Sequence, residues 1–508
     1  MSEEMRLQGL LDHYTGNDTA VVVDISVGGT RREISHARLA ELVRERIEDL
    51  RAAGVRPGQL IGINARNSLE WLVWDLATLE FGAHLYALPD GTPLPGDADD
   101  TEAFLAEAGL VALVADEDGQ ERPADGPLLA PGDRLAGRRL RLDAPAQDLP
   151  NLHSLVFSSG TSGSLKGLRI SRSGTEYVIN RFLEAFGVTG EDRHLIFLPL
   201  SNYQQRLSVY CCLWAGADLA LAPFQRVFAA LQSERPTFLI APPVFYDSTL
   251  QLHRKAGKGQ QLDAFLGGRI RFMITGMAPI RTATLDAYAA AGLSLLEAYG
   301  MTECGMIAWN TAKARRAGTV GRLIDPSAVT FTEDGELVIT RQAPLSLGYF
   351  QVDPAAEPTF LPDGSILTGD FGTLDEDGFL TLRGRRKDVI TLGSGRKVNP
   401  AEIEALFAGA EGVAELVVVS SGDSGRLGAV VSLAGPVTAG TEAAARAAIE
   451  KVNSTIDPYR RLGRLVFVDH PLHSEPRFQT KNMKLRRAAV EEYFAELSAR
   501  RESKGGPA

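Results

Sequence analysis

Phe157-Ser158-Ser159-Gly160-Thr161-Ser162-Gly163-Ser164-Leu165-Lys166-Gly167 is the most informative stretch of the chain. It follows residues 154–157, which are predicted to end a buried strand, and seven of the nine residues 158–166 are Ser, Thr or Gly. Small residues let backbone N–H groups come close to an anion, and the hydroxyls and the lysine add further donors. This composition predicts a loop that wraps nucleotide phosphates, although it lacks the G-x-x-x-x-G-K-[ST] order of a Walker A loop. The alternative is a flexible Gly/Ser linker, which would need neither the strand nor the lysine.

The totals describe a globular protein of more than one domain. The chain has 508 residues, 44% hydrophobic and 23% charged, whereas one domain usually takes about 100–200 residues. Its formal charge of −11, without a long Lys/Arg run, argues against nucleic acid as a partner. We expect no membrane span, because no run of about 18 apolar residues occurs.

The beginning of the chain and its cysteines indicate the compartment. The first residues are acidic without a long apolar run, so they do not resemble a secretory signal. Cys211, Cys212 and Cys304 provide neither a disulfide framework nor zinc-ligand spacing. We therefore expect an intracellular, cytoplasmic protein.

The chain in front of residue 318 alternates predicted strands and helices, which favours parallel sheets in layers. Ser35, then Asn67 or Ser68, and then Ser173 or Thr175 are the candidate starts of helices. Residues 119–150 are rich in Pro, Gly and Asp, so we expect them to be mostly surface loop. The predicted strands are 20–23, 59–65, 110–115, 194–200, 217–222, 237–241, 270–275 and 293–296.

After residue 318 the predicted elements become short strands and then a small mixed unit. A small β unit is predicted from strands at 335–340, 366–368 and 379–382, with a hairpin turn at 375–378. The last unit has predicted strands at 415–420, 428–433 and 465–468, and predicted helices at 400–407, 441–456 and after Met483. We expect residues 498–508 to be disordered.

The predicted fold class is α/β. We expect a large N-terminal domain, residues 1–386, made of two layered α/β subdomains and the small β unit. A small mobile α+β C-terminal domain, residues 387–508, should follow it.

Two glycine-containing stretches follow neighbouring predicted strands. Ile274-Thr275-Gly276-Met277-Ala278-Pro279 ends one strand, and Glu297-Ala298-Tyr299-Gly300-Met301-Thr302-Glu303 ends the next. Open α/β sheets bind ligands in the crevice at the carboxyl ends of their strands. Here Tyr299 offers a flat face for a purine, Thr302 a hydroxyl for a phosphate, and Glu303 a hard oxygen ligand for magnesium. Taken singly, the tyrosine would more often be a core residue and the glutamate a surface residue.

Three further stretches lie nearer to the C-terminus. Asp370, after Leu367-Thr368-Gly369, would suit two ribose hydroxyls, although a lone aspartate after a strand is usually a turn residue. The other two stretches are basic, and a basic helix start is usually a solvated face. They are Arg383-Gly384-Arg385-Arg386-Lys387-Asp388-Val389-Ile390 and Pro476-Arg477-Phe478-Gln479-Thr480-Lys481-Asn482-Met483-Lys484-Leu485-Arg486-Arg487.

In this order the motifs resemble the acyl-adenylate-forming superfamily, which comprises acyl- and aryl-CoA synthetases, peptide-synthetase adenylation domains and luciferases. The phosphate loop is similar to the family's Thr-Ser-Gly-Thr-Thr-Gly-x-Pro-Lys-Gly, and residues 299–303 are similar to its Tyr-Gly-x-Thr-Glu. Residues 368–370 match Thr-Gly-Asp, and residues 384–388 match the interdomain hinge. Within the superfamily, the resemblance is closest to the long-chain acyl-CoA synthetases.

The resemblance implies that a fatty or aromatic carboxylic acid attacks the α-phosphate of ATP. The resulting acyl-adenylate then passes its acyl group to coenzyme A. Since the carboxylate and the triphosphate repel each other, Mg²⁺ and lysines must neutralise the charge.

The resemblance also implies a role for each site residue. The catalytic residues would be Lys484, which bridges the acid and the α-phosphate, Thr302 at the α-phosphate, and Glu303, which also holds the magnesium ion. The ATP-binding residues would be Ser158, Ser159, Gly160, Thr161, Ser162, Gly163, Lys166, Gly276, Met277, Ala278, Glu297, Ala298, Tyr299, Gly300, Asp370 and Arg385. The acid would lie near Tyr203, Pro243, Val244, Phe245 and Met277, and Lys387 would be the hinge.

Some positions depart from the family pattern. Leu165 replaces the proline before the loop lysine, and Met483 replaces the glycine before the catalytic lysine. Asn202-Tyr203-Gln204-Gln205-Arg206 replaces the His-and-aromatic pattern after Pro-Leu-Ser. These departures bear on the identity of the acid more than on the ATP chemistry.

Three functions therefore remain open. The first is an acid–CoA ligase. The second is an adenylating enzyme with another acceptor, namely a carrier-protein thiol, an amine or a small inorganic nucleophile. The third is a nucleotide-binding sensor or scaffold without catalysis. Release of pyrophosphate separates the third from the others, and thiol-dependent release of AMP separates the first from the second.

Overall fold

The structure is a computed structural model. It describes residues 4–89, 92, 98–116, 128–135, 137–159, 165–257, 261–350, 359–421, 426–472, 475–478 and 485–502. For Ser158, Ser159 and Lys166 it describes the backbone alone. The chain divides into two compact units. The first comprises Met1–Ala317, Gly321–Asp325 and Thr340–Ile366, and the second comprises Gly318–Val320, Pro326–Ile339 and Leu367–Ala508.

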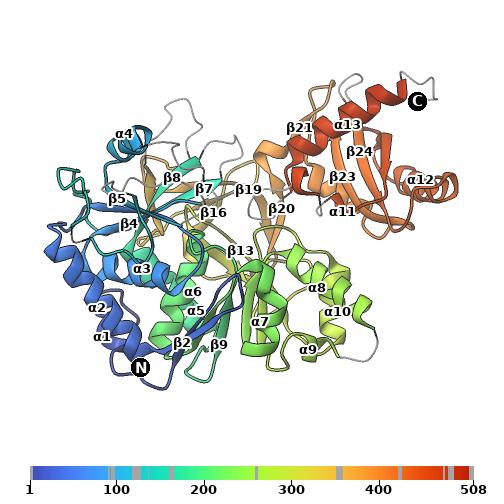
Figure 1. The fold of residues 1–508 in the computed structure, drawn as a ribbon. Helices are drawn as coiled ribbons and strands as arrows, with labels where there is room; N and C mark the ends of the chain where they lie inside the picture. The colour runs from blue at the N-terminus through green and yellow to red at the C-terminus, as the bar shows by residue number, and fades with distance from the viewer. Residues whose placement is uncertain are drawn as a thin grey trace. The chain divides into compact units, whose positions relative to one another are not determined.

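Two large mixed sheets form the first unit in the described part of the chain (Figure 1). In the larger sheet, the strands from β13 to β1 are parallel, and antiparallel strands flank them on both sides. Its order is β15 (Arg322–Leu323), β14 (Gly305–Trp309), β13 (Leu295–Met301), β12 (Phe272–Thr275), β11 (Phe238–Ala241), β9 (Arg193–Ile196), β10 (Asp218–Leu221), β1 (Val21–Ile25) and β2 (Arg31–Ser35).

The other sheet of this unit ends in the strands that flank the phosphate loop. The strands from β7 to β6 are parallel, and β8 and β18 are antiparallel to their neighbours. Its order is β18 (Ser346–Phe350), β8 (Leu165–Ser171), β7 (Leu152–Ser159), β4 (His84–Ala87), β3 (Leu60–Asn64), β5 (Leu110–Ala115) and β6 (Leu128–Leu129).

Helices of the first unit connect and cover these sheets. Those that contact strands of both sheets include α3, which touches β4 and β1, and α5, which touches β8 and β14. The helices are α1 (Leu10–Tyr14), α2 (His36–Ala52), α3 (Leu69–Phe81), α4 (Ala98–Ala108), α5 (Arg172–Phe186), α6 (Tyr203–Ala215), η1 (Phe224–Arg226), α7 (Val227–Glu234), α8 (Pro243–Ala256), α9 (Leu262–Phe265) and α10 (Thr282–Ala290).

Side-chain caps explain where several of these helices begin. Ser35 accepts a hydrogen bond from the backbone of Arg38 at the start of α2, and Ser68 caps α3 in the same way, as the sequence predicted. The predicted start of α5 at Ser173 or Thr175 is wrong. Ser171 caps this helix, because β8 leads directly into it.

A buried ion pair fixes α6 against the strand that leads to the phosphate loop. Arg206 on α6 and Asp75 on α3 are 0% and 1% exposed, and Arg206 Nε donates to Asp75 Oδ2 over 3.1 Å. Arg206 Nη1 also donates to Ser154 Oγ on β7 over 2.8 Å, and the Tyr210 hydroxyl donates to Asp75. Breaking such a pair costs about 3–5 kcal/mol, because it leaves one charge buried alone. The network therefore holds α6 and β7 in one fixed arrangement.

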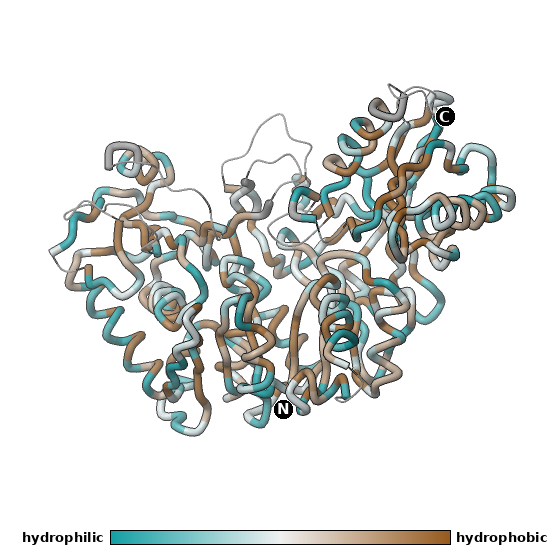
Figure 2. Tube along the Cα trace, turned by 45° about the vertical axis from the view of Figure 1, so that its right-hand side comes forward, coloured by the Kyte–Doolittle hydropathy of each residue, from teal (hydrophilic) through white to brown (hydrophobic). Residues whose placement is uncertain are grey.

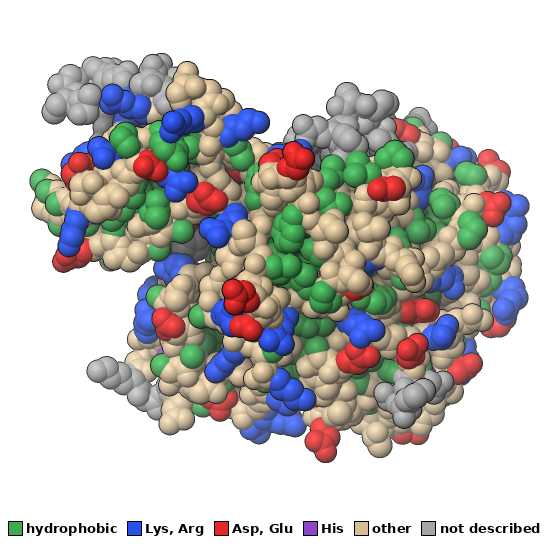
Figure 3. All heavy atoms as spheres, turned by 180° about the vertical axis from the view of Figure 1, so that it is seen from behind, with side chains coloured by type: hydrophobic (Ala, Val, Ile, Leu, Met, Phe, Trp, Pro, Cys, Tyr) green, Lys and Arg blue, Asp and Glu red, His purple; other side chains and the backbone are tan. Residues whose placement is uncertain are grey.

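Hydrophobic and hydrophilic residues alternate along the long outer helices (Figure 2). On the face drawn in Figure 3, basic and acidic side chains are interspersed. Within the described residues, no helix is long and apolar enough to cross a membrane.

The second unit contains the small β unit and the C-terminal elements. One sheet has the order β16 (Val329–Phe331), β17 (Glu336–Ile339), β19 (Ile366–Leu374) and β20 (Leu380–Arg385), and the hairpin turn predicted at 375–378 joins its last two strands. β21 (Ile390–Thr391) pairs with β22 (Lys397–Val398). The remaining sheet has the order β23 (Val413–Ser420), β24 (Leu427–Leu433) and β25 (Leu462–Val468).

Helices cover both faces of this last sheet because its strands are apolar on both sides. Val418 on β23 packs in one cluster with α11 and α12, whereas Val417 and Val419 pack in another with α13. This alternation follows the two-residue period of a strand. The helical segments are η2 (Pro326–Ala328), η3 (Arg386–Asp388), α11 (Pro400–Leu406), α12 (Ala439–Asn453), η4 (Pro458–Arg460), η6 (Pro476–Phe478) and α13 (Arg487–Glu502).

The structure confirms a mixed α/β fold of several sheets and corrects some local predictions. The region 119–150 contains β6 and the buried Leu135 and Ala144, so it is not all surface loop. The predicted disorder from residue 498 onward is wrong as far as residue 502, because α13 continues to Glu502. The predicted domain boundary at residue 386 stays a prediction.

Candidate functional site

The phosphate loop connects the two antiparallel strands of a hairpin. β7 continues to Ser159 and β8 begins at Leu165, with Ser158 opposite Lys166 and Ser159 opposite Leu165. The sequence analysis predicted no strand where β8 lies. A signal was present, because Leu168 and Ile170 are buried and Arg169 between them is half-buried, which is the two-residue alternation of a strand. The predicted loop 158–166 is therefore shorter, and its glycine-rich centre, residues 160–164, lies outside the described residues.

The expected nucleotide site, called the crevice below, lies where β12 ends beside β13. The two strands are parallel neighbours, with Thr275 opposite Glu297. A Cβ atom at Gly276 would lie 2.9 Å from the carbonyl oxygen of Ala298, so glycine is required for the two chains to approach this closely. Met277 follows with φ of 70°, the left-handed conformation that non-glycine residues rarely adopt. Such strain persists where the surrounding structure enforces it, which is common at functional sites.

The second side of the crevice is a β-hairpin rather than a strand end. β13 continues through Ala298, Tyr299 and Gly300 to Met301, and then turns back into β14. Ala298 and Tyr299 are buried, and a Cβ at Gly300 would lie 2.7 Å from the carbonyl oxygen of Gly305. Burial raises the pKa of Glu297 to about 7. Thr302 lies in the hairpin turn, half-buried.

Two side chains that the sequence analysis did not identify support this turn. The Tyr349 hydroxyl donates to Glu303 Oε1 over 3.3 Å and lies 3.2 Å from Thr359 Oγ1. Arg341 donates to the carbonyl oxygens of Cys304 and Met306 over 2.8 and 2.6 Å. Both side chains come from the segment around β18, far from the turn in sequence. No motif in the sequence indicates these contacts.

Glu303 would have to bind a metal ion without a cluster of protein ligands. No group of three or more His, Cys, Asp or Glu side chains with metal-binding geometry occurs among the described residues. Mg²⁺ is commonly bound by one or two carboxylates together with substrate phosphates and water. A single half-buried carboxylate beside the hydroxyl of Thr302 fits that donor set.

The second unit holds the remaining candidate residues. Asp370 lies within β19 and not in a turn after a strand, because it pairs with Arg385 on β20. Arg385 Nε lies 2.9 Å from Asp370 Oδ1, and the aspartate side chain is only 7% exposed. Lys387 is exposed in η3. Lys484 lies outside the described residues, whereas Arg487, three residues later, opens α13 and forms an ion pair with Glu404 over 2.6 Å.

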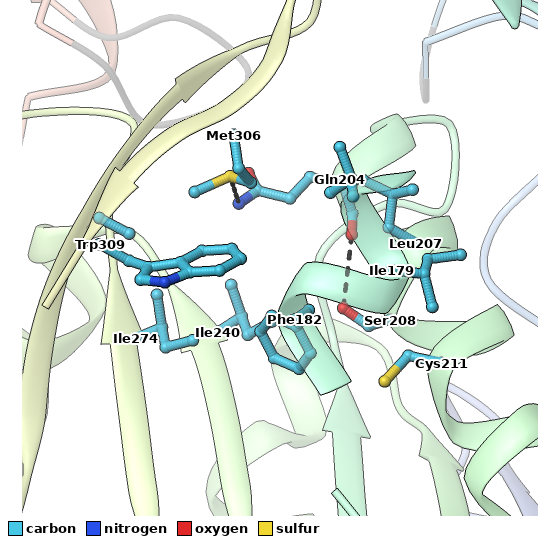
Figure 4. A pocket seen from close by; sticks show the side chains of 12 residues that line it. Ile179, Phe182, Gln204, Leu207, Ser208, Cys211, Ile240, Ile274, Met306 and Trp309 are labelled. Atoms are coloured by element: carbon cyan, nitrogen blue, oxygen red, sulfur yellow. Dashed lines mark hydrogen bonds between the residues drawn. The ribbon is translucent and has the colours of Figure 1, made fainter. Parts of the chain in front are cut away.

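An apolar cavity lies next to the crevice, since strands β12 and β13 contribute to both (Figure 4). Its walls come from α5, α6 and the strands β11, β12, β13 and β14. Ile274 on β12 and Ala298 on β13 belong to its lining. The full lining is Val178, Ile179, Phe182, Gln204, Leu207, Ser208, Cys211, Ile240, Ile274, Ala298, Met306 and Trp309.

The residues expected to contact the acid do not line this cavity. Tyr203 is 2% exposed, and its hydroxyl lies 2.5 Å from Thr175 Oγ1. Pro243 opens α8, Val244 is half-buried beside it, and the Phe245 ring packs on that of Phe197. On α6, the cavity is instead lined by residues 204, 207, 208 and 211. Their helical spacing was the available signal in the sequence.

Comparisons with known proteins agree with this geometry. Residues 12–349 match a family model described as AMP-binding enzyme, and residues 387–500 match one described as AMP-binding enzyme C-terminal domain. The long-chain-fatty-acid–CoA ligase FadD15 of Mycobacterium bovis is 25% identical in an alignment of 476 positions that covers 81% of this chain and 79% of that protein. A feruloyl-CoA synthase of an Amycolatopsis species is 28% identical over 78% of this chain and 82% of its own length.

A solved structure shows the same fold. The ATP-bound crystal structure of MatB from Rhodopseudomonas palustris is similar with a TM-score of 0.77 and 22% sequence identity, over 97% of this chain and 100% of that one. The first family model alone covers more than half of the chain. Together with the crevice at β12 and β13, this match shows that the chain belongs to the family of AMP-binding enzymes.

Proposed function

We propose that this enzyme activates an apolar carboxylic acid, fatty or aromatic, with ATP and transfers the acyl group to coenzyme A. The observation that carries the proposal is the shared use of two strands. β12 ends and β13 continues at the candidate nucleotide crevice, and the same strands supply Ile274 and Ala298 to the apolar cavity. An acid whose body lies in this cavity can place its carboxylate next to a nucleotide in the crevice.

The first step joins two anions. A carboxylate oxygen of the acid attacks the α-phosphorus of ATP, and pyrophosphate leaves with the electron pair of the broken P–O bond. In the proposed arrangement adenine lies against Gly276, Met277, Ala278 and Tyr299, and the Thr302 hydroxyl donates to the α-phosphate. Backbone N–H groups of residues 158–166 and Lys166 bind the β- and γ-phosphates. These groups would lower the barrier by fixing charge and orientation before the reaction.

Glu303 is the proposed magnesium ligand, and when the ion is bound it supplies positive charge against the phosphates. The hydrogen bond from Tyr349 fixes the orientation of this carboxylate. Arg341 holds the backbone on both sides of Gly305, so the turn that carries Glu303 is tied to the sheet. Both are positioning residues in this proposal.

The second step transfers the acyl group from AMP to the acceptor. The thiolate sulfur of coenzyme A attacks the acyl carbon, and AMP leaves as the phosphate anion. We propose coenzyme A as the acceptor because the relatives named above are a CoA ligase and a CoA synthase. A carrier-protein thiol, an amine and a small inorganic nucleophile are the competing acceptors.

We also propose roles for four residues of the second unit. We propose that Asp370 and Arg385 hold the ribose, that Lys387 is the hinge, and that Lys484 bridges the two anions in the first step. The ion pair between Asp370 and Arg385 supports the first of these, since it fixes a carboxylate for the two ribose hydroxyls. The cytoplasmic location and the absence of a nucleic-acid partner stay predictions.

Pyrophosphate release tests the proposal directly. The purified enzyme is incubated with ATP, Mg²⁺ and single acids of several classes, and pyrophosphate is measured with and without coenzyme A. Acid-dependent pyrophosphate, followed by AMP and acyl-CoA only when coenzyme A is present, is the expected result. Acid-dependent pyrophosphate without any acyl-CoA would reject this acceptor and leave adenylation intact.

A further inference from the structure

A buried carboxylate contacts both strands that carry the proposed ribose residues. Asp370 on β19 and Arg385 on β20, called the ribose clamp below, are paired opposite each other. The carboxylate belongs to Glu336 on β17, and its side chain is only 2% exposed. β17 lies next to β19, and β20 lies beyond β19 in the same sheet. A contact between Glu336 and the end of β20 therefore spans β19.

The first oxygen of this carboxylate binds the peptide in front of Asp370. The backbone N–H of Gly369 donates to Glu336 Oε1 over 2.8 Å. Gly369 has φ of 70°, the left-handed conformation that glycine adopts readily. β19 therefore departs from a regular strand directly before Asp370, and the carboxylate accepts the N–H at that point. Hydrogen bonds to an ionised carboxylate are stronger than those between neutral groups.

The residue before Gly369 is bound from the same strand. The Thr368 hydroxyl donates to the backbone carbonyl of Leu337 over 2.9 Å, and it accepts from the backbone N–H of Asp370 over 3.1 Å. Glu336 and Leu337 are neighbours on β17. This strand therefore sets the path of the backbone that leads into Asp370.

The second oxygen of Glu336 binds the residue that follows Arg385. The Arg386 guanidinium donates to Glu336 Oε2, and the arginine side chain is 44% exposed. The two adjacent arginines thus pair with different carboxylates, because Arg385 Nε lies 2.9 Å from Asp370 Oδ1. Without Glu336, Arg386 would be free to compete with Arg385 for Asp370. Arg386 in turn neutralises the buried charge of Glu336, which would be costly alone.

We propose that Glu336 is a positioning residue for the ribose site, with Arg386 as its counter-ion. One oxygen fixes the residue before Asp370, and the other fixes the residue after Arg385. A single side chain thereby holds both halves of the ribose clamp. This inference rests on the proposed function, since it assumes that the clamp binds the ribose. It adds a residue that the sequence analysis did not identify.

Binding of two nucleotides tests this role without requiring turnover. AMP and 2′,3′-dideoxy-AMP differ only in the ribose hydroxyls, and calorimetry gives the dissociation constant of each. The wild type should bind AMP about tenfold or more tightly than the dideoxy analogue, as expected for hydrogen bonds to a charged group. Pyrophosphate release from ATP and an acid is measured on the same preparations, together with the melting temperature.

Variants of the ion pair assign the effect to Glu336. Glu336→Met keeps the length of the side chain but removes both contacts, so the ratio of the two dissociation constants should fall close to one. Combining Glu336→Met with Arg386→Met should give the same ratio in a protein without an unpaired charge. Glu336→Gln keeps an oxygen for the N–H of Gly369 and should give an intermediate ratio.

Asp334→Asn is the matched control. It also removes a carboxylate beside Arg386, since Asp334 Oδ2 lies 3.8 Å from that guanidinium. The Asp334 side chain is 64% exposed, so this variant leaves no buried group without a partner. It should keep the wild-type ratio.

The outcomes are distinguishable. A wild-type ratio in both Met variants would overturn the inference even if their melting temperatures fall, because Glu336 would then contribute to stability alone. An equal loss of the ratio in Asp334→Asn would also overturn it. A wild type that releases pyrophosphate but binds both nucleotides equally would reject the ribose clamp, and this inference with it, while adenylation stands. If no acid releases pyrophosphate, the proposed function fails, and the ratios still decide the role of Glu336. Absence of AMP binding to the wild type would overturn both.

Discussion

Gly276→Ala is the substitution whose effect follows most directly from the geometry of the crevice. The added Cβ would lie 2.9 Å from the carbonyl oxygen of Ala298, whereas ordinary contacts begin at 3.4 Å. The end of β12 and strand β13 would have to separate by about half an ångström. Since the obstacle is a backbone atom, no side-chain rotation can relieve the contact.

The cost can be estimated from overpacking. One additional methyl group in a close-packed region costs about 1–3 kcal/mol. If the strain is relieved by moving Met277 and Tyr299 apart, kcat/KM for ATP should fall by about 5- to 150-fold, since about 1.4 kcal/mol corresponds to a factor of ten. The KM for the acid should change less, because the cavity proposed to hold the acid is lined by Ile274, which precedes Gly276 by two residues.

The assay measures adenylation at varied ATP, together with calorimetric binding of ATP and the melting temperature. Gly132→Ala is the matched control, since a Cβ there would meet no atom within 4 Å. ATP binding and kcat/KM within twofold of the wild type in Gly276→Ala would refute the reasoning. The close approach of the two strands would then be unimportant for the nucleotide.

The remaining predictions concern charges and the second unit. Glu303→Gln should lower the adenylation rate about 10²-fold or more, as for loss of a preorganised electrostatic group, and a normal rate with normal Mg²⁺ dependence would contradict this. The Lys484→Ala variant should not form the adenylate, but it should still transfer the acyl group of a chemically made acyl-adenylate to the thiol. The Lys481→Ala variant should be active in both assays. The reverse pattern would mean that Lys481 and not Lys484 is the catalytic lysine. Lys387→Pro should preserve adenylation and impair thioester formation, because proline fixes φ at a position that must rotate, and equal loss in both steps of a folded variant would argue against a hinge. The folded protein retains the Glu297 proton up to a pKa of about 7, whereas an unfolded chain loses it near 4.5, so stability should fall as the pH rises between these values. Glu297→Gln should flatten that part of the curve of melting temperature against pH, and an unchanged curve would contradict the raised pKa.

The sequence by itself determined the fold class and the order of the chemical motifs. Alternating strands and helices predicted layered sheets, and the candidate caps Ser35 and Asn67 or Ser68 included the residues that cap α2 and α3. These signals are local, because a cap acts within one turn and a strand or helix period within a few residues. The four ordered motifs indicated the family because their residue types are those expected to bind ATP, whatever surrounds them.

Local signals failed where pairing decided the structure. Strand β8 was missed because the loop in front of it is rich in glycine and serine, and it is a strand because β7 and β18 pair with it on either side. Asp370 was expected after a strand, yet pairing with β20 extends β19 beyond it. The residue at which a strand ends depends on the neighbouring strand that pairs with it. That neighbouring strand is distant in sequence or lies across a turn, so local propensity does not encode the end.

The surroundings of the site were decided by the tertiary structure alone. Tyr349 approaches Glu303 across 46 residues of chain, and Arg206 on α6 meets Asp75 across 131. The cavity exists because helices α5 and α6 pack against β11–β14 and leave space between their side chains. A side-chain contact over such a separation depends on the packing of whole elements. The sequence could therefore supply the chemical groups, while only the folded chain decided which of them meet.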